Sequence, residues 1–380
     1  MRIAVLTLTL RANYGGILQA YALQHTLERM GHKVEVFQRW DDYLPPKIVL
    51  CAKYIKRIFR KLFIDWNSPI FCEYNLSKIR PVIEQHTREF INRYINIKEI
   101  DELDQINEFN YDAIIVGSDQ VWRKPYFTNN WNRRISNAFL LFLKRKDIIR
   151  ISYAASFGLD NLSEYSDRDI QECALCAKRF NAISVREVSG VNICKNSFGL
   201  NAVHVLDPTF LLTKNDYIHL IREANIAEEE DENVIMCHIL DPSPLKDRLI
   251  DDFCKKKNLK LINGYAQVYD IASPLEKRIQ PPVESWLSNF HWAKYVITDS
   301  FHACVFAIIF NKPFIVIGNE TRGISRIKSL LSTFQLENRL ISESDDNIDW
   351  DLNIDWDLIN SNLEELKKKS LSFLSTNLNK

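Results

Sequence analysis

The sequence predicts an α/β protein built from two facing Rossmann-like domains. The chain has 380 residues, a natural length for two domains. Short apolar runs alternate with helical patterns along most of it, which is typical of βαβ units in parallel sheets. The alternation forms two series, separated by a break at 213–232 that contains the acidic stretch 228–232. We therefore place a first domain over 1–212, a second over 213–345, and a C-terminal tail and helix over 346–380.

The first series begins with a buried strand over 3–8. A loop over 11–16 leads from it into an amphipathic helix that stops at Gly31, a residue common just after helix ends. Further strands of this series are expected over 34–37, 113–116, 149–153, 182–185 and 203–206. Most of these runs stop at polar or small residues. Because ligands of open α/β sheets bind at the carboxyl ends of strands, the strand ends predict one shared cleft.

The second series repeats the same alternation after the acidic stretch. Its strands are expected over 234–239, 259–262, 295–297 and 313–317. A hexapeptide at 347–352 is repeated at once at 353–358, which we interpret as a local duplication in a loop. An amphipathic helix is expected over 358–374.

Composition excludes several classes of protein. Lys and Arg number 49, as do Asp and Glu, so the neutral chain has no general attraction for nucleic acid. No apolar run reaches the roughly 18 residues of a membrane span. The eight Cys are scattered, and the single CxxC of Cys173 and Cys176 lacks a second pair to complete a zinc site. Structural thiols and a cytoplasmic protein are therefore expected.

A basic amphipathic segment stands out at 47–64, inside an insertion that we place at 41–80. It carries six basic residues and no acidic one, with the basic side chains on one side of a helical wheel and the apolar ones on the other. This pattern is typical of a helix that lies on an anionic membrane, which would place the protein at the inner face of the cell membrane. An amphipathic helix docked on its own domain has the same pattern, so both interpretations stand.

The segment from Thr298 to His302 lies between two apolar runs, where a strand is expected to pass into a helix. Such a position opens onto a crevice, and His is the side chain that most readily moves protons near neutral pH. The alternative is a capped helix whose His only satisfies its own hydrogen bonds. Both interpretations fit the pattern alone.

Arginines and one carboxylate follow other expected strands. Arg186 comes after the strand at 182–185, and Arg322 and Arg326 come after the strand at 313–317. The guanidinium group matches two oxygens of a carboxylate or phosphate, so these residues and His302 suit a small anionic substrate. Alternatively, Arg186 forms a structural ion pair with Glu187 or with Asp207. Asp207 itself is either a base or the cap of a turn with Pro208.

Two loops, which follow the strands expected over 3–8 and 113–116, offer further polar groups. The loop with Asn13, Gly15 and Gly16 precedes a helix, where free backbone amides attract anions, although it is neither a GxGxxG nor a Walker sequence. Binding of a dinucleotide through a GxGxxG loop, or of ATP through a Walker sequence, is therefore not expected. A tight turn explains the same glycines. Ser118 and Asp119 either face the cleft or cap a helix.

Seven segments together resemble the polysaccharide pyruvyl transferase family. They are NYGGILQA at 13–20, VGSDQVW at 116–122, SYAASFG at 152–158, SVRE at 184–187, LDPTFL at 206–211, ITDSFH at 297–302 and KPF at 312–314. The resemblance covers most of the chain and is weak in 41–80 and after 340. It implies a fold similar to that of GT-B glycosyltransferases. It also implies transfer from phosphoenolpyruvate to a sugar hydroxyl pair, often on a lipid carrier, to form a pyruvate ketal.

The resemblance also implies roles for individual residues. His302 matches the family's active-site His, and Asp207 an acidic residue of the family's motif, so both are expected in catalysis. The donor is expected to contact Arg186, Ser300, Arg322 and Arg326. Some members of the family carry Arg at the position of Ser300. Its absence here implies that the anionic groups of the donor depend more on Arg322 or Arg326. The residues expected to face the acceptor are Asn13, Tyr14, Gly15, Gly16, Gln19, Ser118, Asp119 and Gln120.

The expected product is a pyruvate ketal of a capsule, exopolysaccharide or cell-wall saccharide. Ketal formation needs no metal and no cofactor beyond the phosphoenolpyruvate co-substrate, and no metal-binding cluster is visible in the sequence. Two alternatives stay open. One is a glycosyltransferase that uses a nucleotide sugar on the same scaffold, because a fold does not fix its chemistry. The other is a protein that binds a sugar or a partner without catalysis.

Overall fold

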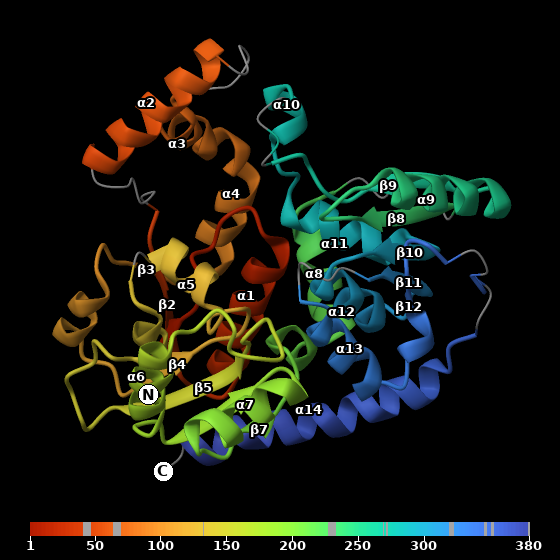
Figure 1. Ribbon diagram of the computed structural model, residues 1–380. Coiled ribbons are helices and arrows are strands. Elements are labelled where there is room, and N and C mark those ends of the chain that lie inside the picture. The colour runs from red at the N-terminus through yellow and green to blue at the C-terminus, as the bar shows by residue number, and fades with distance from the viewer. Residues whose placement is uncertain are drawn as a thin grey trace.

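The computed structural model shows two parallel β-sheets, each flanked by helices (Figure 1). Residues from both halves line a cavity between them. The description covers residues 1–40, 47–63, 70–131, 133–226, 233–268, 270, 273–318, 323–345, 348–350 and 353–378. This arrangement confirms the predicted fold class of two facing Rossmann-like units. The exact domain limits stay a prediction.

In the described residues, the first sheet has seven strands in the order β3-β2-β1-β4-β5-β6-β7, all paired in parallel. The strands are β1 (Arg2–Leu6), β2 (Lys33–Gln38), β3 (Ile97–Glu99), β4 (Ala113–Val116), β5 (Ile149–Ala155), β6 (Ala182–Val185) and β7 (Val203–His204). The central strand β4 is buried along its whole length, as its unbroken apolar sequence AIIV requires.

The second sheet has five described strands in the order β12-β11-β10-β8-β9, again all parallel. They are β8 (Val234–His238), β9 (Lys260–Asn263), β10 (Tyr295–Thr298), β11 (Phe314–Ile317) and β12 (Leu340–Ile341). The short strands β3 and β12 were not expected from the sequence, because two or three residues are too few to show a period.

Each sheet has a point where the strand order reverses. In the first sheet the chain moves outward from β1 to β2 and β3 and then returns to β4 on the other side of β1. In the second it moves from β8 to β9 and returns to β10 on the other side of β8. Loops diverge above such a reversal and leave a crevice at the carboxyl ends of the strands. The two sheets therefore offer two crevices from which one site can be assembled.

Helices connect the strands and cover both sheets. In chain order they are α1 (Tyr14–Arg29), α2 (Lys47–Phe63), α3 (Cys72–Ile83), α4 (Gln85–Tyr94), α5 (Lys124–Trp131), α6 (Asp167–Ala177), α7 (Val188–Phe198), α8 (Lys214–Glu223), α9 (Pro244–Lys257), α10 (Leu275–Arg278), α11 (Val283–Trp292), α12 (Phe301–Ile309), α13 (Ile324–Thr333) and α14 (Trp356–Leu378). Helix α1 begins at Tyr14, with Asn13 as its N-cap residue. Gly15 and Gly16, expected in a loop, therefore lie in its first turn, and their conformation there is helical.

The two halves are joined close to the cavity. Tyr14 stacks on Trp286 with ring centroids 5.1 Å apart, and its hydroxyl donates to the Pro281 carbonyl at 2.8 Å. The Gln280 side chain donates to the Ala12 carbonyl at 3.0 Å. Because Ala12 and Tyr14 lie at the start of α1, these contacts fix the position of its first turn relative to the second half.

Helix α14 forms a second connection, away from the cavity. It runs beneath the second sheet and then under the first (Figure 1). Ser370 Oγ accepts a hydrogen bond from the Leu206 backbone N–H at 3.1 Å, and Leu374 and Leu378 are buried. The helix expected over 358–374 is thus present. It supports the strand end that carries Asp207.

Candidate active site

A cavity of about 160 Å³ lies between the two halves, at the carboxyl ends of strands beside both reversal points. The residues that line it are Asn13, Tyr14, Gly15, Asp119, Gln120, Tyr126, His238, Leu240, Tyr265, Trp286, Asp299, Ser300, Phe301, His302, Arg326 and Ile327. They come from both halves of the chain. Neither half alone contains the complete site.

His302 lies in the first turn of α12, just beyond β10. The turn between them is held by Thr298, whose Oγ1 accepts from the Ser300 N–H at 2.9 Å and donates to the His238 carbonyl at 2.6 Å. Every residue of α12 is buried, so the helix cannot move without repacking the core. The backbone position of His302 is therefore rigid.

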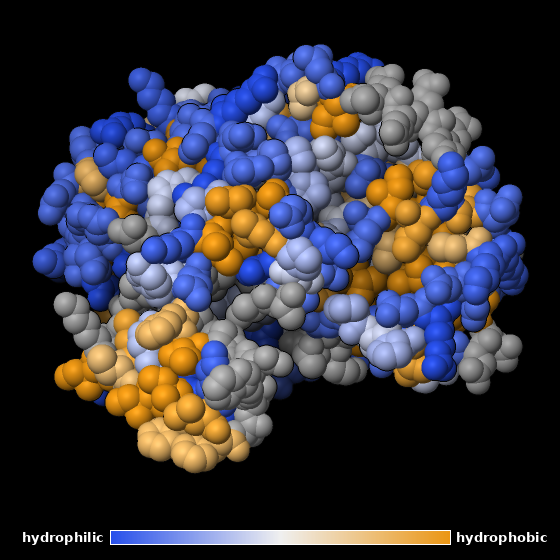
Figure 2. Space-filling view, turned by 90° about the horizontal axis from the view of Figure 1, so that it is seen from above, coloured by the Kyte–Doolittle hydropathy of each residue, from blue (hydrophilic) through white to orange (hydrophobic). Residues whose placement is uncertain are grey.

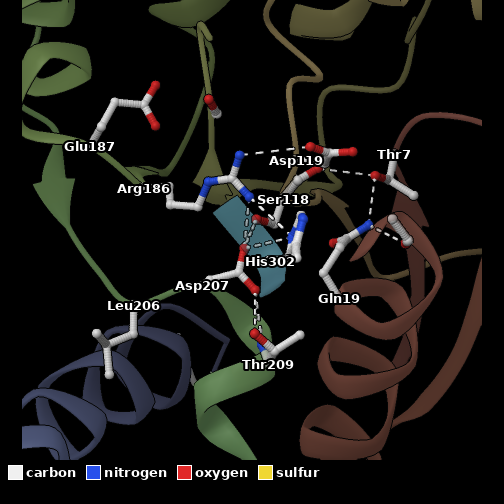
Figure 3. Close-up of polar contacts among 12 residues, drawn as sticks. Thr7, Gln19, Ser118, Asp119, Arg186, Glu187, Leu206, Asp207, Thr209 and His302 are labelled. Carbon is white, nitrogen blue, oxygen red and sulfur yellow. Dashed lines mark hydrogen bonds and ion pairs between the residues drawn. The ribbon is translucent and has the colours of Figure 1, made fainter. Parts of the chain in front are cut away.

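Asp207 gathers the polar groups behind His302 (Figure 3). Its Oδ2 accepts from Arg186 Nη1 at 2.8 Å and from Ser118 Oγ at 3.1 Å, and lies 3.6 Å from His302 Nε2. Its Oδ1 accepts from the Thr209 N–H at 3.1 Å and from Thr209 Oγ1 at 2.7 Å. Both carboxylate oxygens are thus fixed. The carboxylate holds the Nε2 edge of the imidazole and leaves Nδ1 on the side of α1.

The charges of this cluster support an ion pair. Burial raises the pKa of Asp207, but the contact with His302 and the charge of Arg186 outweigh it and hold that pKa well below its usual range. Burial lowers the pKa of Arg186, but Asp207, Asp119 and Glu187 outweigh it and raise it overall. At neutral pH the carboxylate is therefore ionised. It stabilises positive charge on His302 when the imidazole is protonated.

Two buried guanidinium groups lie near the ring of Phe301. The Cζ atom of Arg186 is 4.2 Å from the ring centroid and that of Arg326 is 5.7 Å from it. Burial and the nearby charge of Arg186 lower the pKa of Arg326 to about 10. Arg326 remains a cation at neutral pH and lines the cavity, whereas Arg186 lies behind it. An anionic ligand in the cavity would relieve the repulsion between the two cations.

Helix α1 approaches His302 very closely at Gly15. A Cβ atom placed on Gly15 would lie 2.0 Å from His302 Nδ1, well inside van der Waals contact. Glycine is thus required at this position by the imidazole ring. The loop after β4 adds Asp119, which has a φ of 66° and an Oδ1 atom 3.7 Å from Arg186 Nη2. A left-handed Asp is uncommon, and such strain is often found at functional sites.

The comparisons with known proteins agree with this geometry. The family model described as polysaccharide pyruvyl transferase matches residues 13–321, which include every residue that lines the cavity except Arg326 and Ile327. The chain belongs to the polysaccharide pyruvyl transferase family. No curated protein matches the sequence closely enough to count as a relative.

Solved structures share the fold of this transferase at low sequence identity. The N-terminal domain of Candida albicans trehalose-6-phosphate phosphatase has a TM-score of 0.50 and 9% identity, over 100% of this chain and 96% of that one. UDP-N-acetylglucosamine 2-epimerase from Rickettsia bellii has a TM-score of 0.45 and 11% identity, over 99% and 96%. An α-glucosyltransferase in complex with UDP and DNA has a TM-score of 0.44 and 12% identity, over 97% and 90%. The first of these likenesses agrees with the predicted fold of two facing Rossmann-like units.

The structure places the expected site residues of the transferase in two layers. The residues that line the cavity are Asn13, Tyr14, Gly15, Asp119, Gln120, Ser300, His302 and Arg326. Arg186, Asp207 and Ser118 lie behind them as the hydrogen-bonded cluster described above. Arg186 and Asp207 do form the ion pair that was one alternative, and Asp207 also caps the turn at Pro208, with Thr209 as donor.

The other expected residues lie outside the cavity lining. Gln19 is buried, and its side chain donates to Thr7 Oγ1 at 3.1 Å and to the Gly16 carbonyl at 3.0 Å. Thr7 in turn donates to the Ser118 carbonyl at 3.0 Å, so this chain of bonds supports the loop after β4 (Figure 3). Gly16 faces Asn13 and Asp119 from within α1. Arg322 lies outside the described residues.

Sequence reasoning missed the aromatic side of the site. His238 ends β8, and its Nδ1 accepts from Trp286 Nε1 at 3.1 Å. Burial lowers the pKa of His238 to about 4, so this imidazole is neutral at neutral pH. The ring of Tyr265 packs edge-on against that of His238, with ring centroids 5.4 Å apart. A polar residue at a strand end was a signal for His238, whereas nothing in the local sequence marks Trp286 or Tyr265.

We expect Gly15→Ala to lower the kcat of the transferase about 100-fold, because the added methyl group must displace the imidazole of His302 by an ångström or more. Gly190→Ala is the matched control, since it adds a methyl group to a helix 3.1 Å from Val185 Cβ, and neither residue lines the cavity. Steady-state kinetics and thermal unfolding of both variants make the test. Equal kcat values for the two variants would refute the role of the close approach.

Proposed function

We propose that this transferase moves the enolpyruvyl group of phosphoenolpyruvate onto a hydroxyl pair of a saccharide and forms a pyruvate ketal. The observation that carries the proposal is that a buried cation, Arg326, and an imidazole backed by a carboxylate, His302, line one small cavity. A volume of about 160 Å³ suits a three-carbon donor better than a nucleotide sugar, since pockets for larger ligands usually measure about 300–1,000 Å³.

The first step is protonation of the donor. His302, as the imidazolium, gives its proton to the methylene carbon of phosphoenolpyruvate, and positive charge develops at C2. One sugar hydroxyl adds to C2 and loses its proton. Asp207 stabilises the imidazolium before transfer and fixes its ring, although it does not touch the donor. The donor carboxylate and phosphate are held by Arg326, whose charge offsets theirs.

The second step closes the ketal. The carbon–oxygen bond to phosphate breaks, and the second sugar hydroxyl adds to C2, so one phosphate is released for each ketal formed. Two hydroxyl protons are lost in all: neutral His302 takes up one, which returns it to the acid form, and the departing phosphate carries the other. These are proton transfers and an addition–elimination at one carbon, and the side chains named here suffice for them.

The acceptor is proposed to lie between the loop after β4 and the aromatic ring of Tyr265. Asn13, Asp119 and Gln120 offer hydrogen-bonding groups suited to sugar hydroxyls. Tyr265, which is half-buried, offers a ring surface on which a sugar can pack. We propose a saccharide on a lipid carrier, destined for capsule, exopolysaccharide or cell wall, because the family resemblance implies acceptors of this kind.

The direct test is incubation of the transferase with phosphoenolpyruvate and a panel of lipid-linked and free hexosides. We expect release of inorganic phosphate and, in the acceptor, a mass gain equal to pyruvate less one water. Parallel reactions supply UDP- and GDP-sugars instead. Glycosyl transfer from a nucleotide sugar, with no phosphate released from phosphoenolpyruvate across the panel, would contradict the proposal and favour the glycosyltransferase alternative.

Arg326→Met tests the donor site. Loss of a charge-assisted contact should raise the KM for phosphoenolpyruvate about 10- to 100-fold with a smaller change in kcat. Arg222→Met, an exposed arginine of α8, is the matched control and should leave KM unchanged. An unchanged KM in Arg326→Met would remove Arg326 from the donor site.

A further inference from the structure

Helix α2 projects from the first half, away from the body of the protein (Figure 1). Its contacts include an edge-to-face pair between Tyr54 and Phe71, with centroids 5.0 Å apart, and a hydrogen bond from Arg57 Nη1 to the Ile70 carbonyl at 3.2 Å. Leu50 and Lys61, one turn from these two residues, are half-buried on the same side. The helix therefore rests on the segment before α3 along this narrow side.

The apolar face of α2 is the face that it exposes. Ile48 is 84% exposed, Phe59 60% and Phe63 76%, and Ile55 and Leu62 are exposed beside them. These residues recur at helical spacing and form one stripe. Figure 2 shows the apolar side chains gathered on this projection, at the lower left. The alternative in which the apolar face docks on its own domain is thus not what the structure shows.

Basic residues flank the apolar stripe on one side. Lys53, Lys56 and Arg60 lie on the neighbouring arc of the helix and are exposed, and α2 contains no acidic residue. Large exposed apolar patches mark sites of interaction, and here the patch is bordered by a single sign of charge. Two copies of this helix would each bring basic residues to a shared contact, which is unfavourable. A surface that carries negative charge above an apolar interior can contact both the basic residues and the apolar stripe.

We propose that α2 docks flat on the surface of a bilayer that contains anionic lipid. Its 17 residues give a length of roughly 25 Å, which lies in the interface with the aromatic and aliphatic side chains in the acyl region. Lys56 and Arg60 contact the lipid phosphates. Within the described residues, no helix is both long and apolar enough to cross a membrane. The docking is peripheral.

The docked helix has a structural link to the cavity. Ile83, which ends α3, packs with Ala12 and Val268, and Ala266 packs against this cluster. Each of Ala12 and Ala266 is adjacent in sequence to a cavity residue, Asn13 and Tyr265. The helices that carry α2 therefore meet the body at the rim of the cavity. Docking would hold this rim near the membrane, where a saccharide on a lipid carrier resides.

The test is sedimentation with vesicles of phosphatidylcholine alone or mixed with phosphatidylglycerol. We expect binding to the anionic vesicles at low ionic strength and a marked decrease at high salt, because phosphate–lysine attraction is screened. The double variants Phe59→Ser with Phe63→Ser, and Lys56→Glu with Arg60→Glu, should each reduce the bound fraction about tenfold or more. Circular dichroism and melting should match the unaltered protein, since these side chains are exposed.

Matched controls separate the helix from general surface effects. Leu175→Ser with Leu358→Ser removes exposed leucines from α6 and α14, and Lys255→Glu with Lys256→Glu reverses exposed charges on α9. Neither should alter binding. Equal loss in the controls, equal binding to neutral vesicles, or no binding at low salt would each overturn the proposal. So would a change of oligomeric state in the Phe variant without vesicle binding, which would assign the stripe to a second copy.

The outcome does not depend on the proposed chemistry. Vesicle binding is measured without substrate, and phosphate release from phosphoenolpyruvate with a free saccharide is measured without vesicles. The α2 variants should keep their activity on the free saccharide. A protein that binds vesicles but does not use phosphoenolpyruvate would therefore refute the chemistry alone.

Discussion

Replacing His302 with Gln should lower kcat by about 10²–10⁴-fold, because the side chain that we propose delivers the proton to the donor is lost. Gln keeps a polar group of similar reach and does not enlarge the site. Phosphoenolpyruvate should still raise the melting temperature of the variant, since Arg326, which lines the cavity and is the proposed contact of the donor's anionic groups, is retained. A kcat loss without a loss of donor binding is the signature of a group that acts mainly in the transition state.

The same variant separates two roles for His302. If the imidazole only contacts the phosphate, His302→Gln should raise the KM for phosphoenolpyruvate and leave kcat within about tenfold of the unaltered enzyme.

Asp207→Asn should cause the second large effect, on both stability and turnover. The substitution leaves the buried guanidinium of Arg186 without its 2.8 Å carboxylate, and breaking such a buried pair costs about 3–5 kcal/mol. His302 also loses the carboxylate that lies 3.6 Å from its Nε2 atom and orients its ring, so kcat should fall. Glu365→Gln removes the surface pair with Lys369 and should leave the melting temperature nearly unchanged.

The effect of Asp207 on stability has a defined pH dependence. The folded-state pKa of Asp207 is depressed below the ordinary value of about 3.9. A depressed pKa contributes stability that is fully present above the unfolded-state pKa and is lost as the pH falls toward the folded-state value. The difference in unfolding free energy between the unaltered protein and Asp207→Asn should therefore stay constant from neutral pH to about pH 4 and shrink below it. A difference that vanished near pH 6 would contradict the ion pair.

Much of this arrangement follows from local sequence. The apolar runs indicated most of the strands, and the polar residues that follow them indicated one edge of each sheet. His302, Asp119, Arg186 and Asp207 were found in this way, since a residue just beyond a parallel strand must lie near the crevice. The family resemblance added the roles expected of them.

The parts that could not be predicted depend on packing between distant segments. Arg186 was expected to touch the donor, but the ring of Phe301 and the carboxylate of Asp207 surround it behind the cavity. Trp286 enters the site only because α11 meets the first turn of α1. An amphipathic helix has the same pattern whether its apolar face is covered or open, so the orientation of α2 was beyond sequence reasoning.

Helix α14 limits how the two halves could be exchanged between related proteins. Its first residue, Trp356, borders a pocket of the second half together with Phe253 and Tyr295, whereas Ser370 bonds the backbone next to Asp207 in the first half. A recombinant that joined a foreign second half after residue 212 would also receive a foreign α14 beneath its own Asp207. Exchange of whole halves should therefore succeed only between sequences whose α14 matches the first sheet.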